Sequence, residues 1–248
     1  MAARLYGLPA SHPSLAAQLM LDRKGIEYRR LDLVPAAHRA VLRALRFPGI
    51  TVPALVIDRR RIQGSREIAR ALDELKPEPP LLPADPAARR AVEDAERWGD
   101  EVLQPVPRRI AWWALRKDRS DLGSFLEDAK LPLPNRMALL TSAPVVALSS
   151  RLNQATDAAV EADFAALPGL LDRVDALIAE GTIGGAEPNA ADYQIATSVR
   201  LLMSFDDLRP AIESRPAGEH AVRICPRAIG RIGPVFPSRL LEHLQAPA

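Results

Sequence analysis

The chain has 248 residues, which suits one large domain or two modest ones, and its 48% hydrophobic and 26% charged residues are typical of a globular protein. The 33 Lys and Arg residues nearly balance the 31 Asp and Glu residues, which argues against a dedicated nucleic-acid-binding protein, because such proteins concentrate basic side chains. The single cysteine, Cys225, excludes an intramolecular disulfide and a cysteine-based metal cluster.

Neither a signal-peptide core nor a bilayer-length apolar stretch is visible in the sequence. We therefore expect a cytoplasmic protein with no membrane partner and no nucleic-acid partner. The four histidines, at positions 12, 38, 220 and 243, show no paired spacing of the kind that metal ligands adopt, so we expect no metal.

The first third of the chain alternates between strand-like and helical patterns. Ser11 is the expected N-cap of the first helix and Ser65 that of the third. Together these patterns predict an α/β domain over residues 1–76 with the order β-α-β-α-β-β-α. The predicted strands are 4–7, 26–34, 54–58 and 60–63, and the predicted helices are 11–25, 35–47 and 65–76.

A proline-rich segment follows this domain, and no confident strand lies beyond it. Residues 77–87 read as a linker, and residues 88–248 as an all-helical domain that ends in a tail with one short helix. We expect a kink or break near 103–107 in the first long helix. Asn189 and Asp192 form a capping-box pattern at the clearest helix start. Further helices are predicted in 135–153 and 161–181.

One proline stands inside a strand-like run, at position 53 of the segment 50–57. Proline cannot donate a hydrogen bond to a neighbouring strand and is normally confined to edges and strand starts. A cis peptide bond before Pro53 would turn the chain there. It would leave the N–H and C=O of Val52 free to pair with an extended peptide.

Four segments resemble the glutathione transferase family, and the resemblance covers most of the chain. They read LPASHPSLAAQLML, ITVPALVID, IQGSREIARAL and EPNAADYQIA, in that order and with the proline-rich break before the last. The resemblance implies a thioredoxin-like N-terminal domain, a helical C-terminal domain, glutathione as cosubstrate and a homodimer.

The resemblance also implies a glutathione-binding site. Val52, before Pro53, would pair with the cysteinyl backbone of glutathione, and Ser65 would bind the γ-glutamyl carboxylate at a helix N-terminus, although Ser65 could serve only as a cap. The family usually has an acidic residue before this serine, where this chain has Gly64. The amide of Gln63 could take its place, or the thiol could be a different one.

In serine-type relatives, a hydroxyl at the start of the first helix donates a hydrogen bond to the glutathione sulfur. Ser11 holds that position, and its alternative role is that of an N-cap alone. Ser14 and Tyr6 are the other candidate hydroxyls. His12 would assist Ser11 or lie at the edge of the cleft. A hydrogen bond to the thiolate and a positive helix end both lower the pKa of a thiol.

The remaining candidates would bind the outer parts of the ligands. His38 and Arg39 could bind the glycyl carboxylate, or simply form a solvated helix face. Four residues lie where the electrophile pocket normally forms in the family, although the tryptophans could equally be core residues. They are Arg109, Trp112, Trp113 and Arg116.

These expectations lead to a glutathione transferase that attacks a small hydrophobic electrophile with a thiolate, a detoxification type of reaction. The first alternative is a non-catalytic binding or scaffold protein on the same fold, favoured by Gly64. Others are a transferase that uses a different low-molecular-weight thiol, or a related isomerisation or reductive dehalogenation. A mixed-disulfide reduction is disfavoured, because Ser11 stands where a cysteine would be needed.

Overall fold

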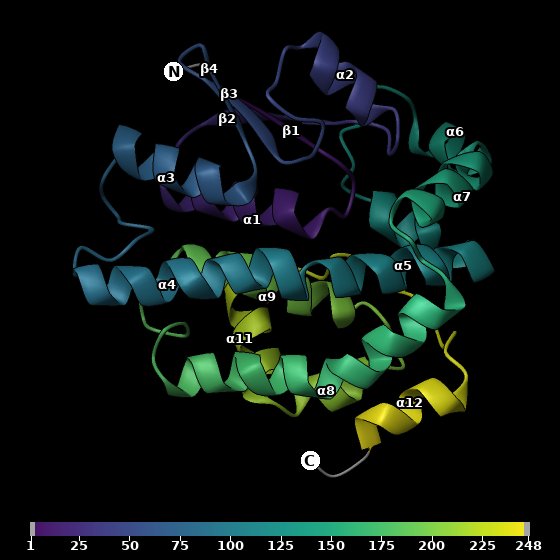
Figure 1. Ribbon diagram of the computed structural model, residues 1–248. Helices are drawn as coiled ribbons and strands as arrows, with labels where there is room; N and C mark the ends of the chain where they lie inside the picture. The colour runs from purple at the N-terminus through teal and green to yellow at the C-terminus, as the bar shows by residue number, and fades with distance from the viewer. Residues whose placement is uncertain (1–2, 246–248) are drawn as a thin grey trace.

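The computed structural model describes residues 3–245 and contains a small α/β domain followed by a bundle of helices (Figure 1). This arrangement confirms the predicted fold class. The α/β domain comprises β1 (Ala3–Gly7), α1 (His12–Arg23), β2 (Tyr28–Asp32), α2 (His38–Ala44), β3 (Ala54–Ile57), β4 (Arg60–Gln63) and α3 (Ser65–Leu75).

The four strands form a mixed sheet in the order β2-β1-β3-β4. Strand β1 runs parallel to β2 and antiparallel to β3, and β3 and β4 form a hairpin. Because successive side chains of a strand point to opposite faces, Leu5 packs in the main core while Tyr6 faces a smaller cluster with Leu42 of α2. Helices α1 and α3 therefore cover one face of the sheet and α2 the other (Figure 1).

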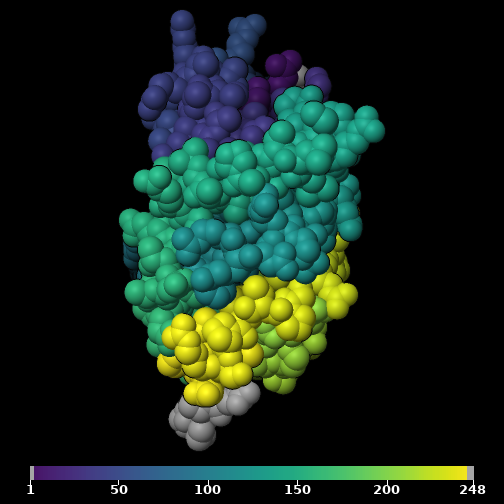
Figure 2. Space-filling model, turned by 90° about the vertical axis from the view of Figure 1, so that its right-hand side faces the viewer, coloured from purple at the N-terminus to yellow at the C-terminus, as the bar shows by residue number. Residues whose placement is uncertain are grey.

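The helical part packs against α1 through α9, which makes the buried core continuous from Leu5 to Leu202. Figure 2 shows the C-terminal segment lying against the end of the helical part that is remote from the α/β domain. The α-helices are α4 (Pro86–Trp98), α5 (Pro105–Lys117), α6 (Asn135–Leu140), α7 (Ser142–Leu152), α8 (Asp157–Ala179), α9 (Ala190–Leu202), α10 (Arg209–Glu213), α11 (Pro216–Ile224) and α12 (Ser238–Gln245).

The break in the first long helix lies slightly before its predicted place, and the segment predicted as helical over 135–153 forms two helices. The break in the first long helix is a π-helical turn over Gly99–Leu103, and Pro105 then begins α5. The helical region 135–153 breaks at Thr141, so that Pro144 lies in the first turn of α7. Proline tolerates a first helical turn because the N–H that it lacks has no partner there.

The helix starts were predicted with mixed success. Ser11 caps α1, and Asn189 and Asp192 form the predicted capping box of α9. Ser65 is not the N-cap of α3, because it is already the first helical residue and Gly64 holds the cap position with φ +92°. That positive φ is readily adopted only by glycine.

The sequence did not predict a 3₁₀ helix, η2 (Ser120–Leu126), or the short helices α10 and α11. Irregular chain joins α3 to α4 in the region predicted as a linker. The exact domain limits of 1–76 and 88–248 stay a prediction. None of the helices within residues 3–245 combines the length and apolarity that crossing a membrane requires.

Candidate active site

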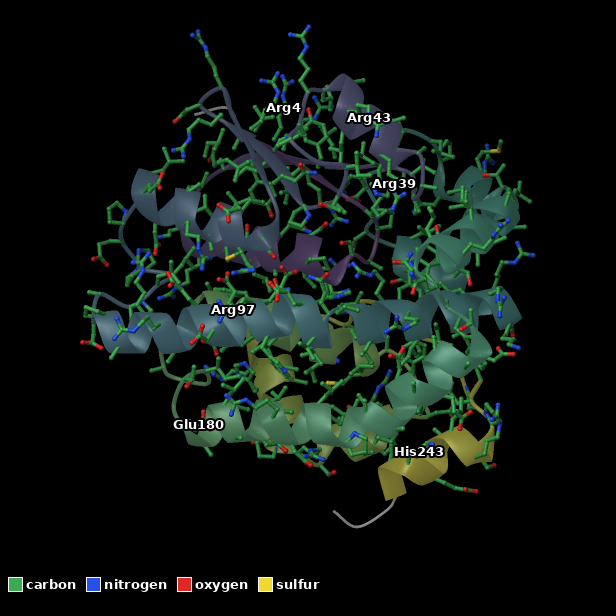
Figure 3. All side chains as sticks on the ribbon, viewed as in Figure 1. Arg4, Arg39, Arg43, Arg97, Glu180 and His243 are labelled. Atoms are coloured by element: carbon green, nitrogen blue, oxygen red, sulfur yellow. The ribbon has the colours of Figure 1, made fainter. Side chains whose placement is uncertain are left out.

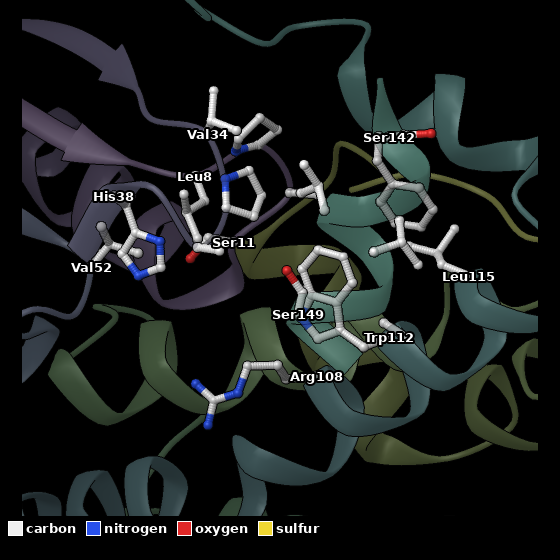
Figure 4. Close-up of a pocket in the computed structure, with 18 of the residues that line it drawn as sticks. Leu8, Ser11, Val34, His38, Val52, Arg108, Trp112, Leu115, Ser142 and Ser149 are labelled. Carbon is white, nitrogen blue, oxygen red and sulfur yellow. The ribbon is translucent and has the colours of Figure 1, made fainter. Parts of the chain in front are cut away.

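A cavity of about 430 Å³ lies between the two domains. Its lining comes from the loop before α1, the start of α2, the turn before β3, helix α5, and the region from η2 to α7. Figure 4 shows Ser11, His38 and Val52 from the α/β domain, with Trp112 and Leu115 of α5 across the cavity. The cavity lining is therefore mostly apolar, with a few polar side chains such as Ser11 and His38 from the α/β domain.

Ser11 is a half-buried residue of this lining, at the N-terminus of α1. The Ser14 hydroxyl donates a hydrogen bond to the Ser11 Oγ at 2.9 Å, and the Ser14 N–H lies 3.4 Å from the same oxygen. A hydroxyl has one proton to donate and two lone pairs to accept with. Since Ser11 accepts from Ser14, its own proton remains available for a ligand.

Ser14 does not line the cavity and is 1% exposed. It packs against Gly7, where an added Cβ would stand 3.1 Å from both the Cβ and the Oγ of Ser14. Tyr6, the third candidate hydroxyl, is also outside the cavity lining and packs edge-on against Phe47 on the other face of the sheet. Of the three candidates, Ser11 alone contributes to the cavity wall.

Val52 stands in this cavity wall, and its peptide bond to Pro53 is cis. Strand β3 begins two residues later, and neither the N–H nor the C=O of Val52 has a backbone partner within residues 3–245. Both groups can therefore pair with an extended ligand that lies beside the chain. Pro53 is buried, and its C=O accepts a hydrogen bond from Gly64 N–H at 2.9 Å.

The two histidines of the site are desolvated. His12 is 2% exposed, and burial together with the charge of Arg108 lowers its pKa to about 3, so that its ring is neutral at neutral pH. Burial also lowers the pKa of His38. Within the described residues, the Nε2 atom of His12 and the Nδ1 atom of His38 are buried without a hydrogen-bond partner. Such atoms in a cavity wall are suited to the polar groups of a ligand.

Three of the expected binding residues lie at the junction of β4 and α3, outside the cavity lining. The hydroxyl of Ser65 donates to Gln194 Oε1 of α9 at 2.7 Å and is buried. The amide of Gln63 donates to Thr51 O at 2.6 Å and accepts from Gly49 N–H. Gly64 contributes backbone only. The side chains of Ser65 and Gln63 are thus already engaged by the protein itself.

Helix α5 divides the expected electrophile-pocket residues between its faces. Trp112 lines the cavity. Arg109, Trp113 and Arg116 do not, because the helix turns their side chains toward α8 and the solvent. Arg109 forms a bidentate ion pair with the Asp163 carboxylate, with N–O distances of 2.6 and 2.9 Å.

Trp113 is buried, donates to Asp157 at 2.7 Å and stacks on Phe236. Arg116 is exposed near Asp157. The sequence missed Arg108, which does line the cavity. The spacing of three or four residues from Trp112 was the available signal, because Arg108 lies one helical turn before it.

A strap formed by residues 130–133, which contributes to the cavity wall, also went unpredicted. Lys130 exchanges backbone hydrogen bonds with the end of β2, since Asp32 N–H donates to Lys130 O at 3.1 Å and Lys130 N–H donates to the Asp32 carboxylate at 2.7 Å. The strap carries Leu131 and Leu133 into the cavity lining. In the described part of the chain, no group of His, Cys, Asp or Glu is arranged to hold a metal ion.

The model of the glutathione S-transferase N-terminal domain family matches residues 5–80, which include all but the first two described residues of the α/β domain. Residues 5–80 are therefore a glutathione S-transferase N-terminal domain. No curated protein sequence shows a significant match to it.

Solved structures, glutathione S-transferases among them, share its fold over nearly the whole chain. The enzyme from Rhodospirillum rubrum F11 is 21% identical, with 98% of this chain and 100% of that chain covered and a TM-score of 0.60. The glutathione S-transferase from Methylobacterium radiotolerans, solved with glutathione sulfonate, is 17% identical over 96% and 99%, with a TM-score of 0.54. FzlA from C. crescentus is 18% identical over 99% and 100%, with a TM-score of 0.58.

The match of residues 5–80 to this domain family and the shared fold support a glutathione transferase-like protein. The matched domain supplies Ser11, His38 and Val52 to the cavity. The neighbouring structures are too distant in sequence to carry an activity or a substrate to this chain.

Proposed function

We propose that this protein is a glutathione transferase in which Ser11 stabilises the glutathione thiolate. The single observation that supports this most strongly is the hydrogen bond from Ser14 to Ser11, which leaves the Ser11 proton free to point at a sulfur in the cavity. The bond also polarises the Ser11 hydroxyl and makes it a better donor.

In this mechanism, the thiol of glutathione loses its proton to solvent, and the thiolate attacks the electrophilic carbon of the second substrate. The Ser11 hydroxyl and the N-terminal end of α1 both favour the charged form of the sulfur. The unpaired N–H and C=O of Val52 hold the cysteinyl backbone beside β3, as another strand would. The leaving group departs with the bonding electrons.

The remaining ligand groups are assigned by position. Arg39, an exposed residue of the cavity mouth on α2 (Figure 3), and His38 bind the glycyl carboxylate. The backbone N–H of Ser65 at the start of α3 binds the γ-glutamyl carboxylate, since its hydroxyl is bonded to Gln194. Trp112 and the apolar residues of α5 and α7 hold the hydrophobic electrophile.

Substitution of Ser11 tests this proposal. We expect Ser11→Ala to lower kcat/KM for glutathione and 1-chloro-2,4-dinitrobenzene by about 10²-fold or more, in line with the loss of a donor to a developing or stable anion. Ser11→Thr keeps the hydroxyl and is the matched control. Turnover of Ser11→Ala at the rate of the wild type, with an unchanged melting temperature, would remove Ser11 from the mechanism.

A second candidate is a glutathione transferase-like protein that binds a ligand without chemistry, or that uses another thiol. It is favoured by Gly64, which supplies no carboxylate for the γ-glutamyl ammonium, and by the engaged side chains of Gln63 and Ser65. Titration calorimetry with glutathione separates the candidates. Measurable binding with turnover supports the transferase, and the absence of both supports the second candidate.

A further inference from the structure

Arg108 is a partly buried cation of the cavity wall with no carboxylate partner in the described residues. Its Nη1 donates to Gln104 Oε1 at 3.2 Å, and the amide of Gln104 donates in turn to Asp100 at 3.0 Å. The group that accepts from the Arg108 guanidinium is therefore a neutral amide and not a carboxylate. The guanidinium carries five N–H donors, so most of them remain free for a ligand.

Two other partly buried arginines, by contrast, each have a carboxylate partner. Arg109 forms a bidentate ion pair with Asp163, and Arg70 of α3 forms an ion pair with Glu96 at 2.6 Å. Desolvation lowers the pKa of Arg108, the charge of Asp100 acts against this, and the charge of Arg109 adds to it. A desolvated charge without a partner is costly to the fold, and an anionic ligand would remove that cost.

The whole cavity lining lacks Asp and Glu among the described residues, whereas it contains two arginines. Arg39 lies in the α/β domain and Arg108 in the helical domain. Figure 4 shows Arg108 beneath Ser11 and His38. The neutral ring of His12 adds no charge of either sign. The cavity is therefore electropositive at two separate points.

These two points belong to different ligands. Arg39 is beside His38, in the part of the cavity assigned to glutathione. Arg108 lies one turn before Trp112 on α5, and both residues line the cavity, with the Arg108 side chain extending beneath Ser11 and His38 (Figure 4). A ligand that stacks on or packs against Trp112 can thus place an anionic group on Arg108.

We propose that Arg108 binds an anionic group on the electrophile, so that the second substrate is an aromatic electrophile that carries a carboxylate. This inference rests on the proposed function and names its substrate class. In the conjugation of a chlorinated nitrobenzoate, the glutathione sulfur forms a bond to the ring carbon, and chloride leaves with the electron pair. The carboxylate stays unchanged on Arg108.

Binding without chemistry gives the first test. The probes are 3-nitrobenzoate and 3-nitrobenzamide, which share a ring but differ in charge and have no leaving group. Calorimetry on the wild-type protein should give the acid an affinity at least ~10-fold above that of the amide, since hydrogen bonds to a charged group are about twice as strong as neutral ones. The preference should fall to about one in Arg108→Gln and survive in part in Arg108→Lys.

Arg116→Gln is the control, because Arg116 lies on the same helix but outside the cavity lining. Equal affinities for the two probes in the wild type, or a preference for the acid that persists in Arg108→Gln, would overturn the inference. A loss of preference in Arg116→Gln would also overturn it, by pointing to the net charge of the protein.

Turnover with glutathione gives the second test, using 4-chloro-3-nitrobenzoate and 4-chloro-3-nitrobenzamide. Arg108→Gln should raise KM for the acid by about 10-fold and lower kcat/KM for the amide by a much smaller factor. A matching loss on both substrates would overturn the inference, since it would place Arg108 at the sulfur. Binding of the acid to Arg108 without any turnover would sustain this site while contradicting the transferase function.

Discussion

At the residue scale, the two serines of α1 have separate roles. Ser11 faces the cavity, and Ser14 lies behind it as a hydrogen-bond donor to the Ser11 oxygen. The sequence left both hydroxyls open as partners of the sulfur, because residues three apart on a helix start can face the same ligand. Their different burial came from the packing of Ser14 against Gly7, which is a contact between elements.

We expect Ser14→Ala to lower kcat/KM for conjugation by about 5- to 10-fold, less than the loss in Ser11→Ala. The reason is that Ser11 keeps its proton but loses the donor that polarises it, and such a neutral hydrogen bond contributes about 1 kcal/mol. The pH dependence of kcat/KM should shift toward alkaline pH. Ser14→Cys keeps a weak donor and should lie in between. An unchanged pH profile in Ser14→Ala would contradict this role.

At the element scale, Lys24 at the end of α1 holds the chain between α3 and α4. Its ammonium is fully buried, forms an ion pair with Asp73 at 2.6 Å and donates to the C=O groups of Lys76, Pro77 and Pro79. The Asp73 carboxylate also accepts from the N–H groups of Leu81 and Leu82 at 2.9 Å. This cluster supplies partners that a proline-rich segment cannot obtain from a helix or a strand.

Lys24→Met should lower the free energy of unfolding by about 3–5 kcal/mol, because it leaves the Asp73 carboxylate and three carbonyl groups without their cation. Chemical denaturation measures the change. Arg60→Gln is the control, because Arg60 of β4 pairs with Glu74 of α3 on the surface, and it should cost less than about 1 kcal/mol. Equal effects of the two substitutions would contradict the role of Lys24.

Local signals and long-range contacts explain what the sequence could predict. The caps at Ser11 and Asn189 depend on neighbouring residues, and they were predicted correctly. The partners of Lys24, the strap at Lys130 and the bond from Ser65 to Gln194 join residues far apart in the chain. The periodicity of a sequence does not indicate such contacts. The bonds from Lys24 to the linker, the strap at Lys130 and the bond of the Ser65 hydroxyl to Gln194 were therefore missed.

At the scale of the whole molecule, two buried histidines make the fold sensitive to acid. Burial lowers the pKa of His12 to about 3 and that of His220 to about 4, with Arg108 and Arg223 respectively adding to the effect. In the unfolded chain each pKa is near 6.5. Below pH 6.5 the unfolded state therefore binds protons that the native state does not, and the stability falls as the pH falls.

We expect the free energy of unfolding to fall between pH 6.5 and pH 5 by up to about 1.4 kcal/mol per pH unit for each histidine. At lower pH, the raised pKa values of Glu96, Asp163 and Asp192 act in the opposite sense, because these carboxyl groups take up protons in the native state first. Urea titrations at several pH values measure the slope. His220→Gln should reduce it, and an identical slope in this variant would contradict the assignment.

The charge of the molecule is also unevenly distributed. Residues 1–76 contain twice as many Lys and Arg as Asp and Glu, although the whole chain is nearly balanced. Arg4, Arg39 and Arg43 mark this basic α/β domain in Figure 3. A positive domain around the thiol site would favour an anionic tripeptide and its thiolate through the long-range field. The near balance of charge over the whole chain conceals this separation.

The central claim is that Ser11 lowers the pKa of a bound glutathione thiol. The direct measurement is a titration of the ultraviolet thiolate absorbance of glutathione bound to the wild-type protein and to Ser11→Ala. We predict a pKa at least one unit below the thiol's ordinary value of about 8.5 in the wild type, and a return toward that value in Ser11→Ala. The same pKa in both proteins, or an unshifted one in the wild type, would contradict the account.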